Sequence, residues 1–375
     1  MISTGHWSMF LSFFFVIAIL ISLIINWLFL RISFNLGAKN KPNQQIRWAA
    51  NIKPAVGGFS FFIVFLISIA FIGGLPRESL SFFDKNILGL TSASTLGFLI
   101  GLADDAYNTN PLVKFIGQLT CAFILILSDV YIHFTEIPAI DFALTTFWVI
   151  GLMNSINMLD NMDGITASIS ATIIFGILGI IFIDGSFQQN FYLVILIGVL
   201  GSLIGFLYFN WNPSRIYMGD TGSQFLGVFL AGIGIIYCWG FKAATNEFFQ
   251  IKLFVIPVIF FIVPIIDTAT VTMRRLMRRQ SPFVGGKDHI THHLVYLGLN
   301  DKQVAIVMIS TSLVSIIATF PLLLGLMEWT IWVTLSYFGY ALVLFFVFQL
   351  LYNKGAAEYA LKQKSARENS LTPMY

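Results

Sequence analysis

Long apolar segments, separated by short polar ones, recur along the whole chain. The first extends from Trp7 to Leu30 and contains no charged residue. Ten further apolar runs follow it, at 55–75, 86–103, 112–128, 140–156, 165–183, 191–210, 222–239, 252–273, 303–325 and 330–351. A helix of about 20 apolar residues is long enough to cross a bilayer. The runs are continuous instead of alternating, which favours helices over barrel strands. The pattern predicts an all-α polytopic membrane protein with about eleven transmembrane helices.

Composition supports this interpretation. Hydrophobic residues make up 57% of the chain and charged residues 10%, whereas about 25% of the residues in soluble domains are charged. We expect one integral membrane domain over residues 1–352 and a solvated cytoplasmic tail over residues 353–375. The net charge of +3 is too small to indicate nucleic-acid binding. Cys121 and Cys238 both lie inside apolar runs, which supports neither a disulfide framework nor a thiolate metal site.

The basic residues predict an orientation. Of the 21 Lys and Arg residues, seventeen lie in one set of alternate loops, and four lie in the other set, namely Arg77, Lys85, Lys242 and Lys252. The positive-inside rule then places the N-terminus outside and the C-terminus in the cytoplasm. The first apolar run has no basic segment before it and no small-residue cleavage site after it, so we expect it to be retained as a span.

Polar residues of chemical interest gather at the predicted cytoplasmic ends of the spans. They are Asp104 and Asp105, Asp160, Asp163, Asp220 and the segment His289–His293. The predicted outer loops are short and carry only scattered charges. The sequence therefore predicts an active site on the cytoplasmic face.

The stretch from Asn154 to Gly164 changes abruptly from apolar residues to amides and carboxylates. Asn157, Asp160 and Asp163 recur every three residues, so in a continuous helix they share one face with Asn154. Carboxylate and amide oxygens at a helix end are typical ligands of hard cations or acid–base groups. The alternative is an ordinary loop, because loops are rich in Asn, Asp and Gly.

Asp104 and Asp105 directly follow an apolar run. Adjacent carboxylates repel each other unless a cation or a proton neutralises one of them. A divalent ion beside phosphate groups would do this, and Lys114, about two turns further on if the next helix starts near Pro111, could meet the same phosphates. The alternative is that these residues simply end an apolar segment at the membrane surface and have no chemical role.

The segment Arg215–Ser223 places Asp220 and Thr221 between two glycines, before another apolar run. Glycine allows close backbone approach, Thr221 can cap the helix, and a helix N-terminus favours an anion. Asp220 is a candidate metal ligand there, and a plain capping turn is the alternative. Lys53, before Gly57 and Gly58, adds a basic residue on the same side, although a simple helix entry explains this segment as well.

The largest predicted inner loop runs from Arg274 to Lys302. Four arginines at the start of this loop share one helical face, namely Arg274, Arg275, Arg278 and Arg279. They could bind phosphates, or their positive charge could fix the membrane topology, and we favour this second role, which we call anchoring. His289, His292 and His293 could ligate zinc, but their spacing matches no structural zinc motif. We favour hydrogen bonds to a phosphate or a nucleotide.

Five motifs in this order resemble the polyprenyl-phosphate N-acetylhexosamine-1-phosphate transferases, over about residues 45 to 300. The motifs are Pro54 with Gly57-Gly58, Gly101 to Gln118 with Asp104-Asp105 and Lys114, Asn154 to Gly164, Met218 to Gly222, and His289 to His293. The predicted eleven spans also resemble the GlcNAc-1-phosphate branch of glycosyltransferase family 4. Members transfer a sugar-1-phosphate from a UDP-sugar to undecaprenyl phosphate in the bacterial inner membrane, release UMP and use Mg²⁺ or Mn²⁺.

The resemblance implies roles for particular residues. It implies that the catalytic residues are Asp104, Asp105, Asp163 and Asp220. Asp220 is the strongest candidate for a metal ligand, and the other candidates are Asp104, Asp105 and Asn157. The implied substrate-binding residues are Lys53, Lys114, Asn157, Asp160, Arg278, His289, His292 and His293. Two departures stand out. Asn161 replaces the usual glycine between two aspartates, and the histidine segment is one residue longer than the common form, which leaves the sugar undetermined.

Two alternative functions follow from the same residues. The nearer one is transfer of phospho-MurNAc-pentapeptide in peptidoglycan synthesis, although the motif around Lys114 and Gln118 resembles the GlcNAc branch more. The other is an ion-coupled transporter, which predicts charged residues near span centres and inverted repeats. The sequence leaves open the sugar, the glycan pathway, the formation of a homodimer, and whether Asp104 or Asp105 acts as a base.

Overall fold

The computed structural model describes residues 4–35, 53–73, 84–135, 137–185, 190–240, 251–281 and 286–371. Within these ranges the chain forms helices and no strand; a single isolated bridge joins Ala55 to Tyr217. The α-helices are α1 (Thr4–Asn35), α2 (Gly58–Gly73), α3 (Lys85–Tyr107), α4 (Pro111–Leu127), α5 (Pro138–Leu159), α6 (Ile165–Ile183), α7 (Tyr192–Asn210), α8 (Gly219–Gly234), α9 (Val255–Phe260), α10 (Ile262–Met277), α11 (Ile290–Tyr296), α12 (Asp301–Leu323) and α13 (Ile331–Leu371).

Every predicted apolar run coincides with a helix or a helix pair. In the described part of the chain, eight helices are long and apolar enough to cross a membrane, and a ninth span results if α9 and α10 are counted as one. The helices α2 and α4 are shorter, with 16 and 17 residues. The chain is therefore a multi-pass membrane protein, and the count of eleven spans stays a prediction.

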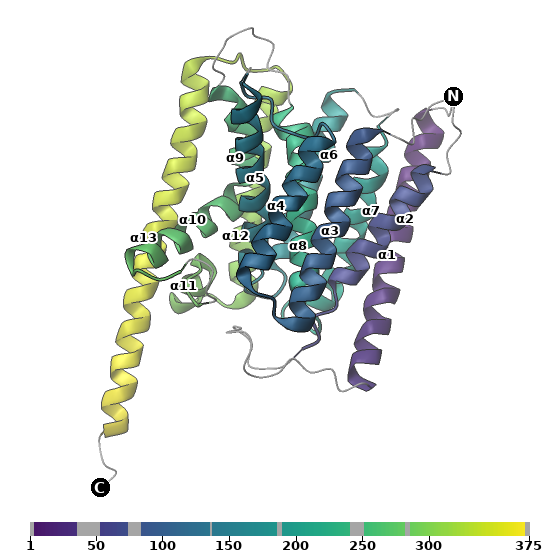
Figure 1. Ribbon diagram of the computed structural model, residues 1–375. Helices are drawn as coiled ribbons and strands as arrows, with labels where there is room; N and C mark the ends of the chain where they lie inside the picture. The colour runs from purple at the N-terminus through teal and green to yellow at the C-terminus, as the bar shows by residue number, and fades with distance from the viewer. Residues whose placement is uncertain are drawn as a thin grey trace.

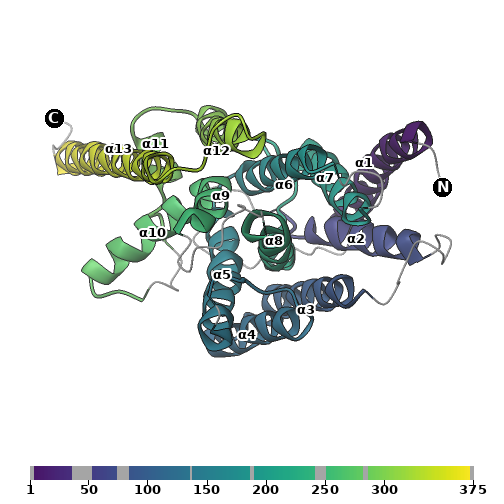
Figure 2. The same ribbon diagram turned by 90° about the horizontal axis from the view of Figure 1, so that it is seen from above.

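The run at 252–273 is not the single straight span that we expected. The chain breaks at Phe261, and α10 leaves α9 at an angle of 89°. Pro264, in the first turn of α10, has no amide hydrogen to donate to the carbonyl of Phe260, so the α-helical ladder cannot continue through this point. As a result, α10 projects sideways from the bundle at mid-depth (Figures 1 and 2).

The helix α8 lies at the centre of the bundle, enclosed by α2, α3, α5, α6 and α9 (Figure 2). Glycine allows this close packing, because a Cβ atom at Gly101 of α3 would collide with the backbone of Asp220, and one at Gly58 of α2 would collide with Gly222. Small residues let helix backbones approach closely in membranes. The close approach of α3 to α8 brings Asp104 and Asp105 beside Asp220.

The long helix α13 passes through the predicted boundary at residue 353. Our prediction of a tail from Asn353 did not include a helix, yet α13 continues to Leu371. Tyr352 is buried, and Tyr359 stacks on Tyr296 of α11 with ring centroids 4.3 Å apart. This part of α13 is therefore packed against α11, whereas the side chains of residues 358–365 are exposed.

The predicted functional residues lie at one end of the bundle. This end is formed by the C-terminal ends of α3 and α5 and the N-terminal ends of α4, α6 and α8, and it is the lower end in Figure 1. The short helix α11 lies on the same side, next to α13. The gathering of polar residues that the sequence predicted is thus present in the fold.

Candidate active site

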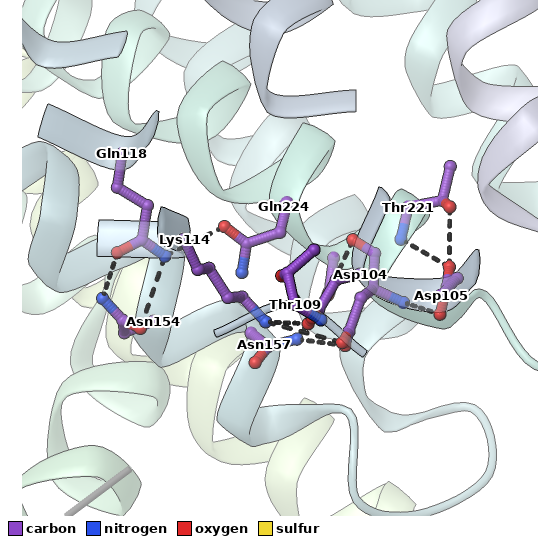
Figure 3. Close-up of polar contacts among 11 residues, drawn as sticks. Asp104, Asp105, Thr109, Lys114, Gln118, Asn154, Asn157, Thr221 and Gln224 are labelled. Carbon is purple, nitrogen blue, oxygen red and sulfur yellow. Dashed lines mark hydrogen bonds and ion pairs between the residues drawn. The ribbon is translucent and has the colours of Figure 1, made fainter. Parts of the chain in front are cut away.

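Two carboxylates share one lysine at the centre of the site (Figure 3). The Nζ atom of Lys114 lies 2.7 Å from an oxygen of Asp104 and 3.4 Å from an oxygen of Asp220. The three side chains come from the last turn of α3 and the first turns of α4 and α8, and each is less than one-fifth exposed. A partly buried cation between two carboxylates is a strongly coupled charge cluster.

The turn between α3 and α4 fixes Asp104 and Lys114 relative to each other. Asn108 adopts the left-handed conformation that asparagine tolerates, with φ of 51°. Asn110 accepts a hydrogen bond from the amide of Leu112, and Pro111 begins α4. The second oxygen of Asp104 accepts hydrogen bonds from the amide and the hydroxyl of Thr109, at 2.9 and 2.7 Å. The side chain of Asp104 is thereby held toward Lys114.

Asp105 caps α8 instead of joining this cluster. Its Oδ1 accepts the amide of Asp220 at 3.0 Å, and its Oδ2 accepts the amide and the hydroxyl of Thr221 at 2.9 and 2.6 Å. The positive end of the helix dipole favours a carboxylate at this place. Our expectation that Thr221 would cap the helix was wrong, because a carboxylate from α3 does so. Adjacent Asp104 and Asp105 therefore avoid repulsion by facing Lys114 and a helix N-terminus respectively.

Asn157 orients Asp220 from the last turn of α5. Its Nδ2 donates to Oδ1 of Asp220 at 2.6 Å and to the hydroxyl of Ser223 at 2.8 Å. Asn157 therefore contacts a predicted metal ligand through its amide nitrogen. The prediction had Asn157 as a ligand in its own right, which would require the amide oxygen.

A chain of amides lies behind the carboxylates and ends at a buried donor. Asn154 donates to the carbonyl of Ile150 and to Gln118, and Gln118 donates to the side-chain oxygen of Gln224. Because the carbonyl of Ile150 can only accept, it sets the direction of the whole chain. The amide nitrogen of Gln224, which points away from Gln118 (Figure 3), is buried and has no hydrogen-bond partner among the residues that the structure describes. Our sequence reasoning missed Gln224, although it lies one turn after Asp220 on α8.

Asp163 and Lys53 form a second polar group. The carboxylate of Asp163 accepts the amide and the hydroxyl of Ser214 at 2.9 and 2.8 Å, and an amide hydrogen of Asn212 at 3.2 Å. Lys53 lies 3.6 Å from the carboxylate of Asp163 and donates to the hydroxyl of Ser214 at 2.9 Å. Asp163 thus holds the α7–α8 connection, and the structure gives it a positioning function that the sequence did not predict.

The predicted common face of Asn154, Asn157, Asp160 and Asp163 does not persist. The helix α5 ends at Leu159, and Asp160 is its C-terminal cap. The side chains of Asn154 and Asn157 point into the amide chain and toward Asp220, whereas Asp163 already belongs to the entry into α6. The three-residue spacing was therefore a correct indication of a polar helix end, but not of one continuous face.

The histidine segment begins α11 and is buried. His289 is the N-cap residue of α11, and its Nδ1 lies 2.8 Å from Asp267 of α10. Thr291 donates to Oδ1 of Asn161 at 2.8 Å, which joins the segment to the loop after α5. The two departures from the family pattern, Asn161 and the longer histidine segment, therefore contact each other. Asp267 was missed because it is a single carboxylate inside an apolar run.

Burial sets the charge of two histidines. Loss of hydration lowers the pKa of His292 to about 3 and the pKa of His293 to about 4, and the nearby His289 acts in the same direction. Both rings are therefore neutral at pH 7. They can form hydrogen bonds with a phosphate or a sugar, but they do not contribute positive charge.

The four arginines are mostly engaged in ion pairs and hydrogen bonds within the protein. Arg274 donates to Gln349 and Asn353 of α13 and lies over the ring of Tyr352. Arg275 and Arg278 both pair with Asp288, at 3.3 and 2.9 Å. Arg278, our predicted substrate ligand, is half exposed and keeps part of its guanidinium accessible. The anchoring of the topology by these arginines stays a prediction.

The donor set of the central cluster fits a hard divalent cation. Among the described residues, no group of three or more His, Cys, Asp and Glu side chains is arranged to enclose a metal. Mg²⁺, however, is usually bound through one or two carboxylates together with substrate phosphates. Asp104 and Asp220 supply two such carboxylates around the side chain of Lys114, whereas the oxygens of Asp105 are engaged by the backbone amides at the N-terminus of α8 and by Thr221.

The fold and the site define a multi-pass membrane protein with a buried carboxylate–lysine cluster at one end of its bundle. Residues 87–238, which contain the whole cluster, match the model of glycosyl transferase family 4. This segment of the chain is therefore similar to glycosyl transferase family 4.

Curated relatives carry names that agree with this family. A Bacillus subtilis protein named "Probable undecaprenyl-phosphate N-acetylglucosaminyl 1-phosphate transferase" is 29% identical over 78% of this chain and 79% of its own length. The decaprenyl-phosphate N-acetylglucosaminephosphotransferase of Mycobacterium leprae is 26% identical over 68% of this chain and 69% of its own. The phospho-N-acetylmuramoyl-pentapeptide-transferase of Lactiplantibacillus plantarum is 28% identical over 70% of this chain and 81% of its own length.

Proposed function

We propose that this protein transfers an N-acetylhexosamine-1-phosphate, with GlcNAc-1-phosphate as the first candidate, from a UDP-sugar to undecaprenyl phosphate. UMP is released, and the lipid-linked sugar initiates a cell-envelope glycan. The observation that carries this proposal is the cluster of Asp104, Lys114 and Asp220 at the end of an apolar helical bundle. Such a position lets a lipid phosphate and a water-soluble nucleotide reach the same charged groups.

The reaction needs charge neutralisation more than it needs a nucleophilic side chain. An oxygen of the lipid phosphate attacks the β-phosphorus of the UDP-sugar, and the bond to the UMP oxygen breaks. Lys114, which bridges the two carboxylates, supplies positive charge to the phosphates when they bind. Asn157 and Thr109 hold Asp220 and Asp104 in place meanwhile, because each donates to the carboxylate that it contacts.

Asp104 and Asp220 would hold the Mg²⁺ ion that the family uses, or Mn²⁺ in its place. A bound divalent ion supplies Lewis-acid stabilisation of the phosphate oxygens. Asp105 keeps the N-terminus of α8 at a fixed position beside them. Neutral His292 and His293, with His289, provide hydrogen bonds for the phosphates or the sugar. Asp160 and Asp163 of the loop between α5 and α6, with Lys53, which lies 3.6 Å from Asp163, contact the nucleotide.

The membrane placement belongs to the same proposal. Counting α2, α4 and the α9–α10 pair with the eight longer helices gives eleven membrane segments. The distribution of Lys and Arg supports an N-terminus outside and a site at the cytoplasmic face of a bacterial inner membrane. A cytosolic UDP-sugar and a membrane lipid would meet there.

Transfer of phospho-MurNAc-pentapeptide is the second candidate, because a relative of that name matches 70% of the chain. The experiment that separates the two offers UDP-GlcNAc, UDP-GalNAc and UDP-MurNAc-pentapeptide in parallel to the purified protein, with undecaprenyl phosphate and Mg²⁺. We expect UMP release from UDP-GlcNAc, dependent on both the lipid and the metal. Turnover of UDP-MurNAc-pentapeptide alone would establish the second candidate, and transmembrane ion flux without UMP release would favour a transporter.

A further inference from the structure

A fully buried carboxylate lies in α10, outside the Asp104–Asp220 pair. Asp267 has no exposed surface, and its Oδ2 lies 2.8 Å from Nδ1 of His289. Its Oδ1 accepts the amide hydrogen of Ile290, the first residue of α11, at 3.0 Å. Burial of a carboxylate is costly unless it is well hydrogen-bonded. Both oxygens of Asp267 therefore contact the first two residues of the histidine segment, His289 and Ile290.

These contacts define the state of the His289 ring. The amide of Ile290 can only donate, and an ionised carboxylate can only accept, so the proton of the imidazole lies on Nδ1. The Nε2 atom, on the other side of the ring, is then the nitrogen that can contact a substrate. His289 and His292 meet edge to face, with ring centroids 5.4 Å apart, which further limits rotation of the ring.

The helix α10 is itself held firmly beside the active site. Ser155 of α5 donates to the carbonyl of Pro264, and Thr268 donates to the hydroxyl of Ser155, each at 2.8 Å. On the other side, Gln349 of α13 donates to Thr270. Ser155 lies two residues before Asn157, the residue that orients Asp220. The helix that carries Asp267 is thus hydrogen-bonded to α5, the helix that carries Asn157.

We propose that Asp267 is a positioning residue of the active site, an inference that rests on the proposed function. It holds His289 with Nδ1–H directed at α10 and presents Nε2 to the sugar nucleotide. The sideways bend of α10 at Phe261 places Asp267 where it can do this. Asp267 acts only through His289 and touches no substrate itself.

A kinetic cycle tests the proposal with Asp267→Asn, His289→Ala and the double variant. Asparagine keeps the size of the side chain, but it offers an N–H group where His289 needs an acceptor. We expect kcat to fall about 100-fold in Asp267→Asn, as when other carboxylate partners of imidazoles are replaced. The KM for undecaprenyl phosphate should not change. In the His289→Ala background, Asp267→Asn should cause almost no further loss; equal losses in both backgrounds would overturn the proposal.

Asp141→Asn is the matched control. Asp141 is also buried, and its carboxylate accepts the amides of Phe134 and Thr135, but it lies at the opposite end of α5 from the site. This variant should lose thermal stability comparably while retaining kcat. A matching fall of kcat in Asp141→Asn would show that the kinetic loss in Asp267→Asn reports general destabilisation, which would overturn the positioning role.

A spectroscopic readout separates this inference from the proposed function. Nitrogen-15 spectra of histidine-labelled protein, with His289→Ala to assign the signal, report which ring nitrogen carries the proton. We expect His289 to be protonated at Nδ1 in the wild type and to change state in Asp267→Asn. Protonation at Nε2 alone in the wild type would overturn the pairing even if UMP is released. Failure of the wild type to release UMP would instead refute the function, while the spectra still decide the pairing.

Discussion

The central cluster and the histidine segment are built in different ways. Asp104, Lys114 and Asp220 lie at the ends of three helices of the bundle; the turn between α3 and α4 holds Asp104 beside Lys114, and the packing of α3 against α8 brings Asp220 to them. His289, by contrast, begins the short helix α11 and is held by Asp267 of the bent helix α10, while Thr291 contacts Asn161. The family match covers the first region and ends before the second. We infer that the first region performs the phosphoryl transfer and that the second adapts the site to its sugar nucleotide.

The largest effect should come from replacing Asp220. We expect Asp220→Ala to lower Mg²⁺-dependent UMP release by about 10³-fold or more, because it removes the strongest candidate metal ligand from a preorganised site. The elution profile and the melting temperature should stay close to those of the wild type. Asp129→Ala, at an exposed ion pair near the other end of the bundle, is the control. Near-normal turnover of Asp220→Ala at ordinary Mg²⁺ would refute the ligand assignment.

Replacing Lys114 should have a smaller effect on turnover and an opposite effect on metal binding. Lys114→Met removes the cation between Asp104 and Asp220, so we expect kcat to fall about 10²-fold. The two carboxylates, no longer neutralised, should then bind Mn²⁺ more tightly in the absence of substrate. Turnover assays and paramagnetic titration with Mn²⁺ measure these two quantities. Weaker Mn²⁺ binding by Lys114→Met would contradict the view that Lys114 and the metal serve the same carboxylates.

The contact between Asn161 and Thr291 should influence the choice of sugar. We expect Asn161→Gly and Thr291→Ala each to change the ratio of kcat/KM for UDP-GlcNAc and UDP-GalNAc by about 3- to 10-fold, because the lost hydrogen bond is worth about 1 kcal/mol. The double variant should behave like either single variant, since both remove the same contact. Ser336→Ala, which removes an exposed hydroxyl from α13, is the control. Strictly additive changes would refute the coupling.

The last effect concerns the stability of the fold at low pH and not turnover. The pKa of His292 falls from 6.5 in the unfolded chain to about 3 in the fold, so the unfolded state binds more protons between these pH values. Stability should therefore be complete above pH 6.5 and decline as the pH falls toward 3. At pH 5 the loss attributable to His292 is about 2 kcal/mol. Melting temperatures at pH 7.5 and pH 5 should differ less in His292→Gln than in the wild type. An unchanged difference would contradict the neutral, buried state of His292.

Much of the architecture was accessible from hydropathy alone. All apolar runs became helices, because a bilayer requires internally satisfied backbone hydrogen bonds. The gathering of Asp104, Asp160, Asp220 and the histidine segment at one end of the bundle followed from counting basic residues and spans. The break before α10 was not predicted, although Pro264 was the available signal for it.

The hydrogen-bond partners of individual side chains could not be predicted from hydropathy and charge. Asp105 faces the N-terminus of α8 because glycines at the α3–α8 contact allow the two helices to approach, and that contact joins residues more than 100 positions apart. Asp267 looked like an isolated polar residue in an apolar run. An ionisable residue inside a membrane segment is itself a functional signal, and this signal would have pointed to the histidine segment.

We propose that the cluster of Asp104, Lys114 and Asp220 transfers the β-phosphoryl group of a UDP-sugar to a lipid phosphate. The most direct measurement uses UDP-GlcNAc labelled at the β-phosphorus, incubated with the purified protein, undecaprenyl phosphate and Mg²⁺. We predict that the label moves into the lipid fraction in equal amount to the UMP released, and that Asp220→Ala abolishes this transfer. Label that remains with the nucleotide, or that appears as free sugar phosphate without lipid product, would contradict the account.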